Sequence, residues 1–213
     1  MTESVNLLLI SLLKSSGFLT IDMVKIYYGL SGSFKSSTIV KENKRILKSS
    51  NKIWKYYQNG AFKGLTEYND LNYGILQLVR LNEMAMKYDD FAVERGVTDN
   101  IFYYLAKGNT LNQDTIENIC NEELKILKNF TVEKILLIQE DYDFIRDVVL
   151  KDKYRSDAFN GDLEYYKAQQ IDYINFTCKH NNIDKTIRIK SAQDYIENVL
   201  GDKFINPEIS NQQ

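Results

Sequence analysis

The amino-acid sequence predicts an α/β domain in which a five-stranded parallel sheet is covered by helices on both faces. Five short runs rich in β-branched and aromatic residues alternate with stretches whose apolar residues recur at helical spacing. One of these runs, residues 134–138 (Lys-Ile-Leu-Leu-Ile), has no polar alternation, as expected of a strand buried on both faces. The 213 residues are 44% apolar, which allows a substantial core and excludes disorder as the main state.

The predicted strands share this composition and are separated by turn residues or helices. In chain order they cover residues 24–28, 53–57, 91–93, 134–138 and 186–189. The predicted helices share an apolar face at spacings of three and four residues. They cover residues 35–49, 71–85, 116–127, 144–149 and 163–178, and a last helix opens with the capping box Ser191-Ala192-Gln193-Asp194. Because helices separate successive strands, a ligand site is expected at the carboxyl ends of the strands.

The domain organisation follows from the absence of repeats, low-complexity tracts and linkers in the sequence. Residues 1–22 are expected to form a helical N-terminal appendage. The apolar run 5–13 within them is too short to span a bilayer and lacks the flanks of a signal peptide. Residues 23–205 are expected to form the main domain, and residues 206–213 a frayed tail.

Composition excludes several classes of protein. There are 27 basic and 29 acidic side chains, so the formal charge is 27 − 29 = −2. The sequence therefore lacks the basic excess that would indicate a long nucleic acid or an acidic membrane as a partner. The two cysteines, Cys120 and Cys178, and the single His180 exclude a disulfide scaffold and a Cys-rich zinc site. These counts favour a reducing, cytoplasmic location.

A glycine-rich loop follows the first predicted strand. It reads Gly29-Leu30-Ser31-Gly32-Ser33-Phe34-Lys35-Ser36 and matches the Walker A pattern G-x-x-x-x-G-K-[ST], except that Phe34 replaces the last glycine. Such a loop cradles phosphates with backbone amides, and the next helix adds its dipole. We expect Lys35 to reach the β- and γ-phosphates of ATP and Ser36 to bind Mg²⁺. The predicted ATP-binding residues are Gly29, Ser31, Gly32, Ser33, Phe34, Lys35, Ser36 and Ser37. A simple Gly/Ser turn with a solvent-facing lysine is the alternative.

An acid and a base follow the third predicted strand. Glu94 and Arg95 stand side by side at a buried strand end, where each charge needs a partner. A phosphate–Mg²⁺ site supplies both partners: Glu94 would serve the metal or take a proton, and Arg95 would bind a phosphate or the acceptor. Asp99 is predicted to contact the substrate. A structural ion pair, with Asp99 as a helix cap, is the alternative.

These motifs resemble those of the P-loop deoxynucleoside kinase and thymidylate kinase group. Glu94-Arg95 is similar to the E-R-S motif of deoxynucleoside kinases, and residues 74–80 resemble the helix that lines the acceptor pocket. The resemblance implies a P-loop NTPase-type three-layer fold with a helical lid. It also implies that Arg80 contacts the acceptor phosphate and that Gln77 reaches the base. The resemblance also leaves a homodimer as an open alternative, because related kinases are commonly dimeric.

A polar stretch after the fourth predicted strand resembles the lid of these kinases. Residues 151–156 read Lys-Asp-Lys-Tyr-Arg-Ser, within a lid expected at about 146–162. A lid excludes water, so that phosphate passes to the acceptor. Arg155 is the main candidate for stabilising the transferring group, ahead of Lys151, Lys153 and Arg146. A solvated basic face is the alternative.

The sequence thus predicts a kinase that uses ATP and Mg²⁺ on a nucleoside or a nucleoside monophosphate. A nucleoside hydroxyl benefits from a general base, and deoxynucleoside kinases place a carboxylate for this just after the second strand. Here no acid directly follows residues 53–57, and the nearest acids are Glu67 and Asp70. That favours a monophosphate, whereas Glu94 is typical of nucleoside kinases. Two further alternatives are a nucleotide-binding protein without transferase activity, which Phe34 favours, and a polynucleotide 5′-kinase, which the balanced charge disfavours.

Overall fold

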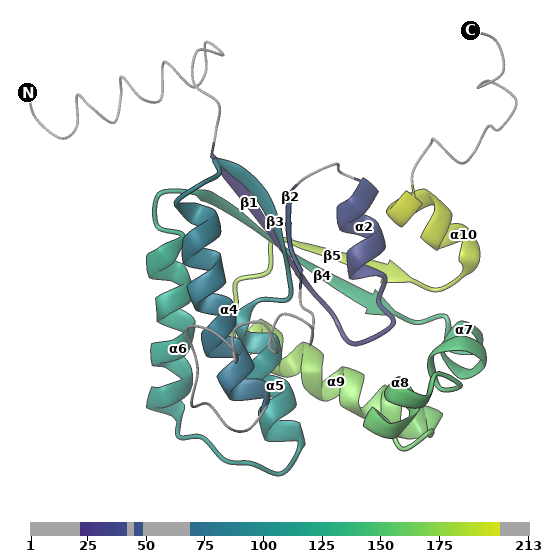
Figure 1. Ribbon diagram of the computed structural model, residues 1–213. Coiled ribbons are helices and arrows are strands. Elements are labelled where there is room, and N and C mark those ends of the chain that lie inside the picture. Colours follow the sequence, from purple (N-terminus) through teal and green to yellow (C-terminus); the bar gives the residue numbers. More distant parts are fainter. Residues whose placement is uncertain (1–21, 42–44, 49–68, 201–213) are drawn as a thin grey trace, which may run out of the picture.

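The structure is a computed structural model that describes residues 22–41, 45–48 and 69–200 (Figure 1). Residues 1–21 of the expected appendage, the strand expected at 53–57 and the expected tail lie outside the described residues.

Five parallel strands form one sheet. They are β1 (Met23–Tyr28), β2 (Arg45–Leu47), β3 (Asp90–Glu94), β4 (Thr131–Gln139) and β5 (Lys185–Ile189). Strands β1, β3 and β4 are mostly buried, and the edge strands β2 and β5 are more exposed. The order of the strands is β2-β3-β1-β4-β5, and Ile26 of the central strand lies opposite Val93 on one side and Lys134 on the other. With a glycine-rich loop joining β1 to the first helix, this confirms the predicted P-loop NTPase-type α/β class.

Helices cover both faces of the sheet (Figure 1). Those packed on one face are α4 (Asp70–Ala85), α5 (Val97–Ala106), α6 (Gln113–Ile126) and α9 (Leu163–His180). The other face carries α2 (Lys35–Lys41), α10 (Ala192–Tyr195) and the π-helical turn η2 (Ile196–Leu200). Between β4 and α9 lie α7 (Tyr142–Phe144), the π-helical turn η1 (Ile145–Val149) and α8 (Lys153–Ala158).

The alternation of side chains along the strands builds two cores. In β1, Ile26 and Tyr28 face the helices of the first layer, whereas Tyr27 faces α2 and η2. In β3, Phe91 belongs to the same core as Ile26 and Tyr28, and Ala92 belongs to the same core as Tyr27. All five side chains are fully buried, so the central strands read as continuous apolar runs.

One predicted helix was wrong over its second half. The expected helix 35–49 ends at Lys41, and Ile46 and Leu47 belong to β2 instead, where Ile46 lies opposite Ala92. Periodicity cannot separate a short apolar pair in a helix from one in a strand, and pairing with β3 decides the outcome. Helix α5, which the sequence analysis did not predict, begins directly after Gly96.

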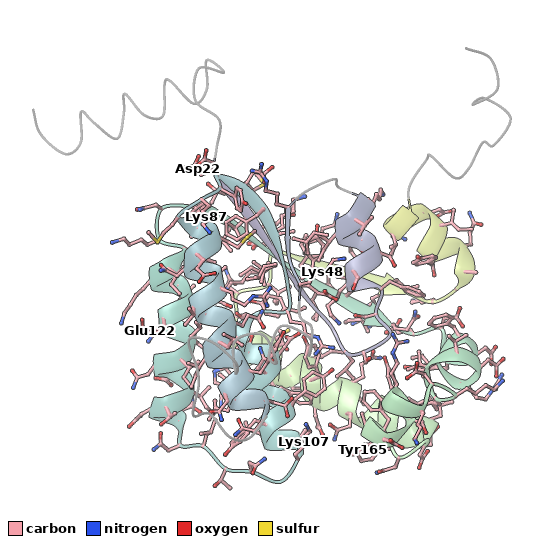
Figure 2. All side chains as sticks on the ribbon, in the orientation of Figure 1. Asp22, Lys48, Lys87, Lys107, Glu122 and Tyr165 are labelled. Carbon is pink, nitrogen blue, oxygen red and sulfur yellow. The ribbon has the colours of Figure 1, made fainter. Side chains whose placement is uncertain are left out.

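The polar edge of the sheet is set by the strand direction. Asp22 precedes β1 at one end of the molecule, and Lys107 lies at the opposite end (Figure 2). The glycine-rich loop follows β1, and Glu94 is the last residue of the adjacent strand β3, so both lie at the carboxyl edge of the sheet. Ser191 accepts a hydrogen bond from the Asp194 amide and so caps α10 as predicted. Within the described ranges, no helix combines the length and apolar character needed to cross a bilayer.

Candidate active site

The loop after β1 takes a conformation that depends on its two glycines. Gly29 has a φ of 151° and Gly32 a φ of 89°, both in the region that L side chains rarely adopt. A Cβ on Gly29 would lie 2.6 Å from the Leu137 carbonyl oxygen. The loop therefore turns tightly against β4, and the glycines at these two positions are structurally required.

Phe34 takes the left-handed conformation that glycine usually supplies, with a φ of 60°. This conformation costs a non-glycine residue about 1–2 kcal/mol. The Phe34 ring packs on Phe144 and Tyr195 with centroid distances of 4.8 and 4.0 Å. Two aromatic pairs contribute about 0.5–1.5 kcal/mol each, which offsets the backbone cost. The phenylalanine thus departs from the motif in sequence and keeps its backbone geometry.

The Lys35 ammonium lies inside the loop. It is 5% exposed and donates to the Leu30 carbonyl at 2.8 Å, to Ser33 Oγ at 3.1 Å and to the Gly29 carbonyl. Burial lowers the pKa of Lys35, and the neighbouring Arg95 guanidinium lowers it further. A polyphosphate bound in the loop would offset both effects, so the site suits an anion.

Ser36 and Glu94 meet at the cavity, although they come from different elements. Ser36 Oγ, in the first turn of α2, donates a hydrogen bond to Glu94 Oε1 at the end of β3. The structure therefore brings the two predicted metal ligands together. No group of three or more His, Cys, Asp or Glu side chains in the described part of the chain could hold a metal by itself. Two oxygen ligands that need phosphate oxygens and waters to complete the shell are typical of Mg²⁺.

Arg95 has a left-handed backbone that Gln77 holds in place. Its φ is 73°, its amide donates to the Tyr27 carbonyl at 3.0 Å, and Gln77 Nε2 donates to its carbonyl. Gln77 is 3% exposed and also accepts from Asn100 Nδ2 at 2.9 Å. Both ends of its amide are therefore bonded to protein, which indicates that Gln77 positions Arg95. The Arg95 guanidinium lies 5.3 Å from the ring centroid of Tyr103.

Asp99 is fully buried and is linked to the loop through Tyr173. The Tyr173 hydroxyl donates to Asp99 Oδ1 at 2.6 Å and accepts from the Gly29 amide at 2.6 Å. Burial raises the pKa of Asp99, while the charge of Lys35 opposes that rise. The sequence analysis assigned no role to Tyr173; its spacing of seven residues from Tyr166, about two helical turns, is the signal that could have placed it on the inward face.

One cavity of about 290 Å³ collects most of the predicted site. It is lined by residues 31–37, from the loop and the first turn of α2, together with Glu94, Arg95, Phe144 and Arg155. Three of these side chains are cationic (Lys35, Arg95 and Arg155) and one is a carboxylate, so the cavity attracts anions. Residues from β3 and α8 thus complete a site that begins in the loop.

The other predicted residues lie outside this cavity. Arg80 Nη1 donates to the Lys48 carbonyl at 3.0 Å and so joins α4 to the end of β2. Gln77 and Asp99 lie behind the lining. Arg146 forms ion pairs with Asp143 and Asp147, and Lys151 with Asp147, on the exposed side of η1. Among the four cations of the expected lid, Arg146, Lys151, Lys153 and Arg155, only Arg155 lines the cavity.

No family model and no curated protein matches the chain. A solved structure that it matches is the crystal structure of thymidylate kinase from Ehrlichia chaffeensis, with 14% sequence identity and a TM-score of 0.44. The match covers 79% of this chain and 88% of that chain. At this distance no activity is transferred from that protein.

Proposed function

We propose that the protein is an ATP-dependent phosphotransferase that passes the γ-phosphoryl group to a nucleoside monophosphate or nucleoside. The observation that carries this proposal is the convergence of loop 31–37, the Ser36–Glu94 pair, Arg95 and Arg155 on one cavity. Phosphoryl transfer is catalysed mainly by positioning and by stabilisation of charge. Two arginines and a carboxylate from other elements supply the charges that stabilise such a transfer.

On the donor side, the loop amides and Lys35 would hold the phosphates of ATP. The Lys35 ammonium now bonds to loop oxygens, which phosphate oxygens would replace as acceptors. Ser36 and Glu94 would hold Mg²⁺, and their oxygen-only donor set fits that ion. The bound metal would supply neutralisation of the phosphate charge.

For the acceptor side, two of the five buried side-chain atoms without a hydrogen-bond partner in the described part of the chain are relevant. They are Nε of Arg95, a donor, and Oδ2 of Asp99, an acceptor. A buried polar group left unpaired costs about 1–3 kcal/mol. A polar substrate that accepts from Arg95 would relieve part of this cost, and so would one that donates to Asp99 through a water.

The end of β2 supports a monophosphate as the acceptor. Lys48 follows β2 directly (Figure 2), and Arg80 bonds to its carbonyl. Asp70, an acid near residues 53–57 in sequence, is bound to Lys107 at 2.6 Å. Glu94 is engaged by Ser36. The cations at this edge, together with the engagement of Asp70 and Glu94 by other side chains, suit an acceptor that is already anionic and needs no general base.

Arg155 would stabilise charge on the transferring group from the lid side. It lies on α8 within the expected lid, and no described acidic side chain forms an ion pair with it. A guanidinium free of such a partner can bind phosphate oxygens in a bidentate fashion.

A screen for ADP release tests the proposal. Purified protein with ATP and Mg²⁺ would be assayed against nucleosides, nucleoside monophosphates and a 5′-hydroxyl oligonucleotide. We expect release to depend on a monophosphate and to fall at least about 100-fold in Lys35→Ala. Lys125→Ala, which removes an exposed ammonium on α6, is the matched control and should keep full activity. ATP binding without turnover on any acceptor would support a non-catalytic nucleotide-binding protein instead.

A further inference from the structure

Three aromatic rings from distant parts of the chain meet beside the cavity, and two of them, Phe34 and Phe144, line it. Phe34 belongs to the loop, Phe144 ends α7 and Tyr195 ends α10. The Phe34 ring lies 4.8 Å from the Phe144 ring and 4.0 Å from the Tyr195 ring, centroid to centroid. Helices α2, α7 and α10 lie on the same side of the molecule (Figure 1). Phe34, which replaces the last glycine of the motif, is therefore the point where the three segments meet.

The loop makes a second close contact with the same segment. A Cβ on Gly32 would lie 2.8 Å from Val149 Cγ2, at the end of η1, and Val149 is fully buried. The loop therefore contacts the segment 142–149 at two places, through Phe34 at Phe144 and through Gly32 at Val149. From the side of α9, the Tyr166 hydroxyl donates to the Ser31 carbonyl at 3.0 Å.

We propose that Phe34 is a positioning residue that fixes the phosphate loop to the base of the lid. The segment 142–149 leads into α8, which carries Arg155. Because Phe34 and Gly32 hold this segment against the loop, they set where the Arg155 guanidinium falls relative to the phosphates. Glycine at position 34 would keep the left-handed backbone and lose the ring. The effect on catalysis rests on the proposed function; the mechanical link does not.

Two explanations of Phe34 make opposite predictions for Phe34→Gly. If the phenylalanine only impairs a motif that prefers glycine, Phe34→Gly improves nucleotide binding and turnover. If the ring positions the lid, Phe34→Gly lowers kcat by about tenfold, with a smaller change in KM for ATP. Phe34→Tyr keeps the ring and should rescue activity to within about threefold of the unmodified protein.

The mechanical link has a readout that needs no activity. In the nucleotide-free protein, amide hydrogen exchange over residues 142–149 should accelerate about fivefold or more in Phe34→Gly, and remain unchanged in Phe34→Tyr. Phe144→Ala removes the contact between the Phe34 and Phe144 rings without altering the loop sequence. It should accelerate exchange in η1, directly after residue 144, by the same factor. Phe176→Leu is the matched control, because it removes ring contacts with Phe102 and His180 and none with Phe34 or Phe144, and it should leave this segment unchanged.

A double-mutant cycle connects the link to Arg155. In the Arg155→Ala background, Phe34→Gly should lower kcat by less than about twofold, because the group it positions is already absent. Unchanged exchange together with equal or higher kcat in Phe34→Gly would overturn the proposal. If the unmodified protein shows no ATP turnover, the proposed function fails, and the exchange measurement still decides the role of Phe34.

Discussion

Removal of one hydroxyl group, in Tyr173→Phe, is expected to destabilise the protein strongly. The hydroxyl accepts from the Gly29 amide and donates to Asp99, both at 2.6 Å, and all three residues are buried. The substitution leaves one buried donor and one buried carboxylate oxygen unpaired, at about 1–3 kcal/mol each. We therefore expect a loss of about 2–4 kcal/mol, after some relaxation, in the free energy of unfolding.

The loss is measurable by urea denaturation and by calorimetry. In a protein of 213 residues, a change of 2–4 kcal/mol corresponds to a fall in Tm of about 4–16 °C. Tyr165→Phe, on the same helix and labelled in Figure 2, is the matched control and should change stability by less than about 0.5 kcal/mol. Equal stability of the two variants would refute the reasoning that the Gly29–Tyr173–Asp99 bonds support the loop.

Three further substitutions test the site and the electrostatics. Arg155→Ala should lower kcat by about 100-fold and leave the Tm unchanged. The control Arg45→Ala removes an exposed guanidinium stacked on Tyr88 and should leave kcat unchanged. Steady-state kinetics measure kcat for both variants. Glu94→Gln should raise the Mg²⁺ concentration needed for half-maximal activity by about tenfold, measured by metal titration, and an unchanged titration would contradict its metal role. Burial raises the pKa of Glu123, so the folded state holds that proton more tightly than the unfolded state, and stability should fall as pH rises above about 4.3. Glu123→Gln should weaken this pH dependence in urea titrations between pH 5 and 8, and identical slopes would contradict it.

The carboxyl-edge site was largely predictable because its parts are local in sequence. The loop and Glu94-Arg95 each follow a strongly apolar strand, and β1 and β3 are neighbours in the sheet, so their ends converge. Arg155 was predictable as a candidate from the polar stretch between two helices. Its presence in the cavity, while Arg146 pairs with Asp143, is a result of folding.

Features that depend on long-range contacts could not be predicted. Strand β2 has three residues, and only pairing with β3 distinguishes it from a continuation of α2. The Tyr173 hydroxyl finds partners 144 and 74 residues away in sequence, at Gly29 and Asp99. Phe34 is tolerated because its ring meets Phe144 and Tyr195, which no local pattern indicates.

The most direct test is a crystal structure with a non-hydrolysable ATP analogue and Mg²⁺. We expect the triphosphate to lie in the amides of residues 29–36, with Lys35 Nζ transferred from the Leu30 carbonyl to a phosphate oxygen. We expect Ser36 and Glu94 at the metal and Arg155 at the terminal phosphate. An empty loop at saturating analogue, with the ammonium still bonded to the loop carbonyls, would contradict the proposal that this chain binds ATP to transfer phosphate.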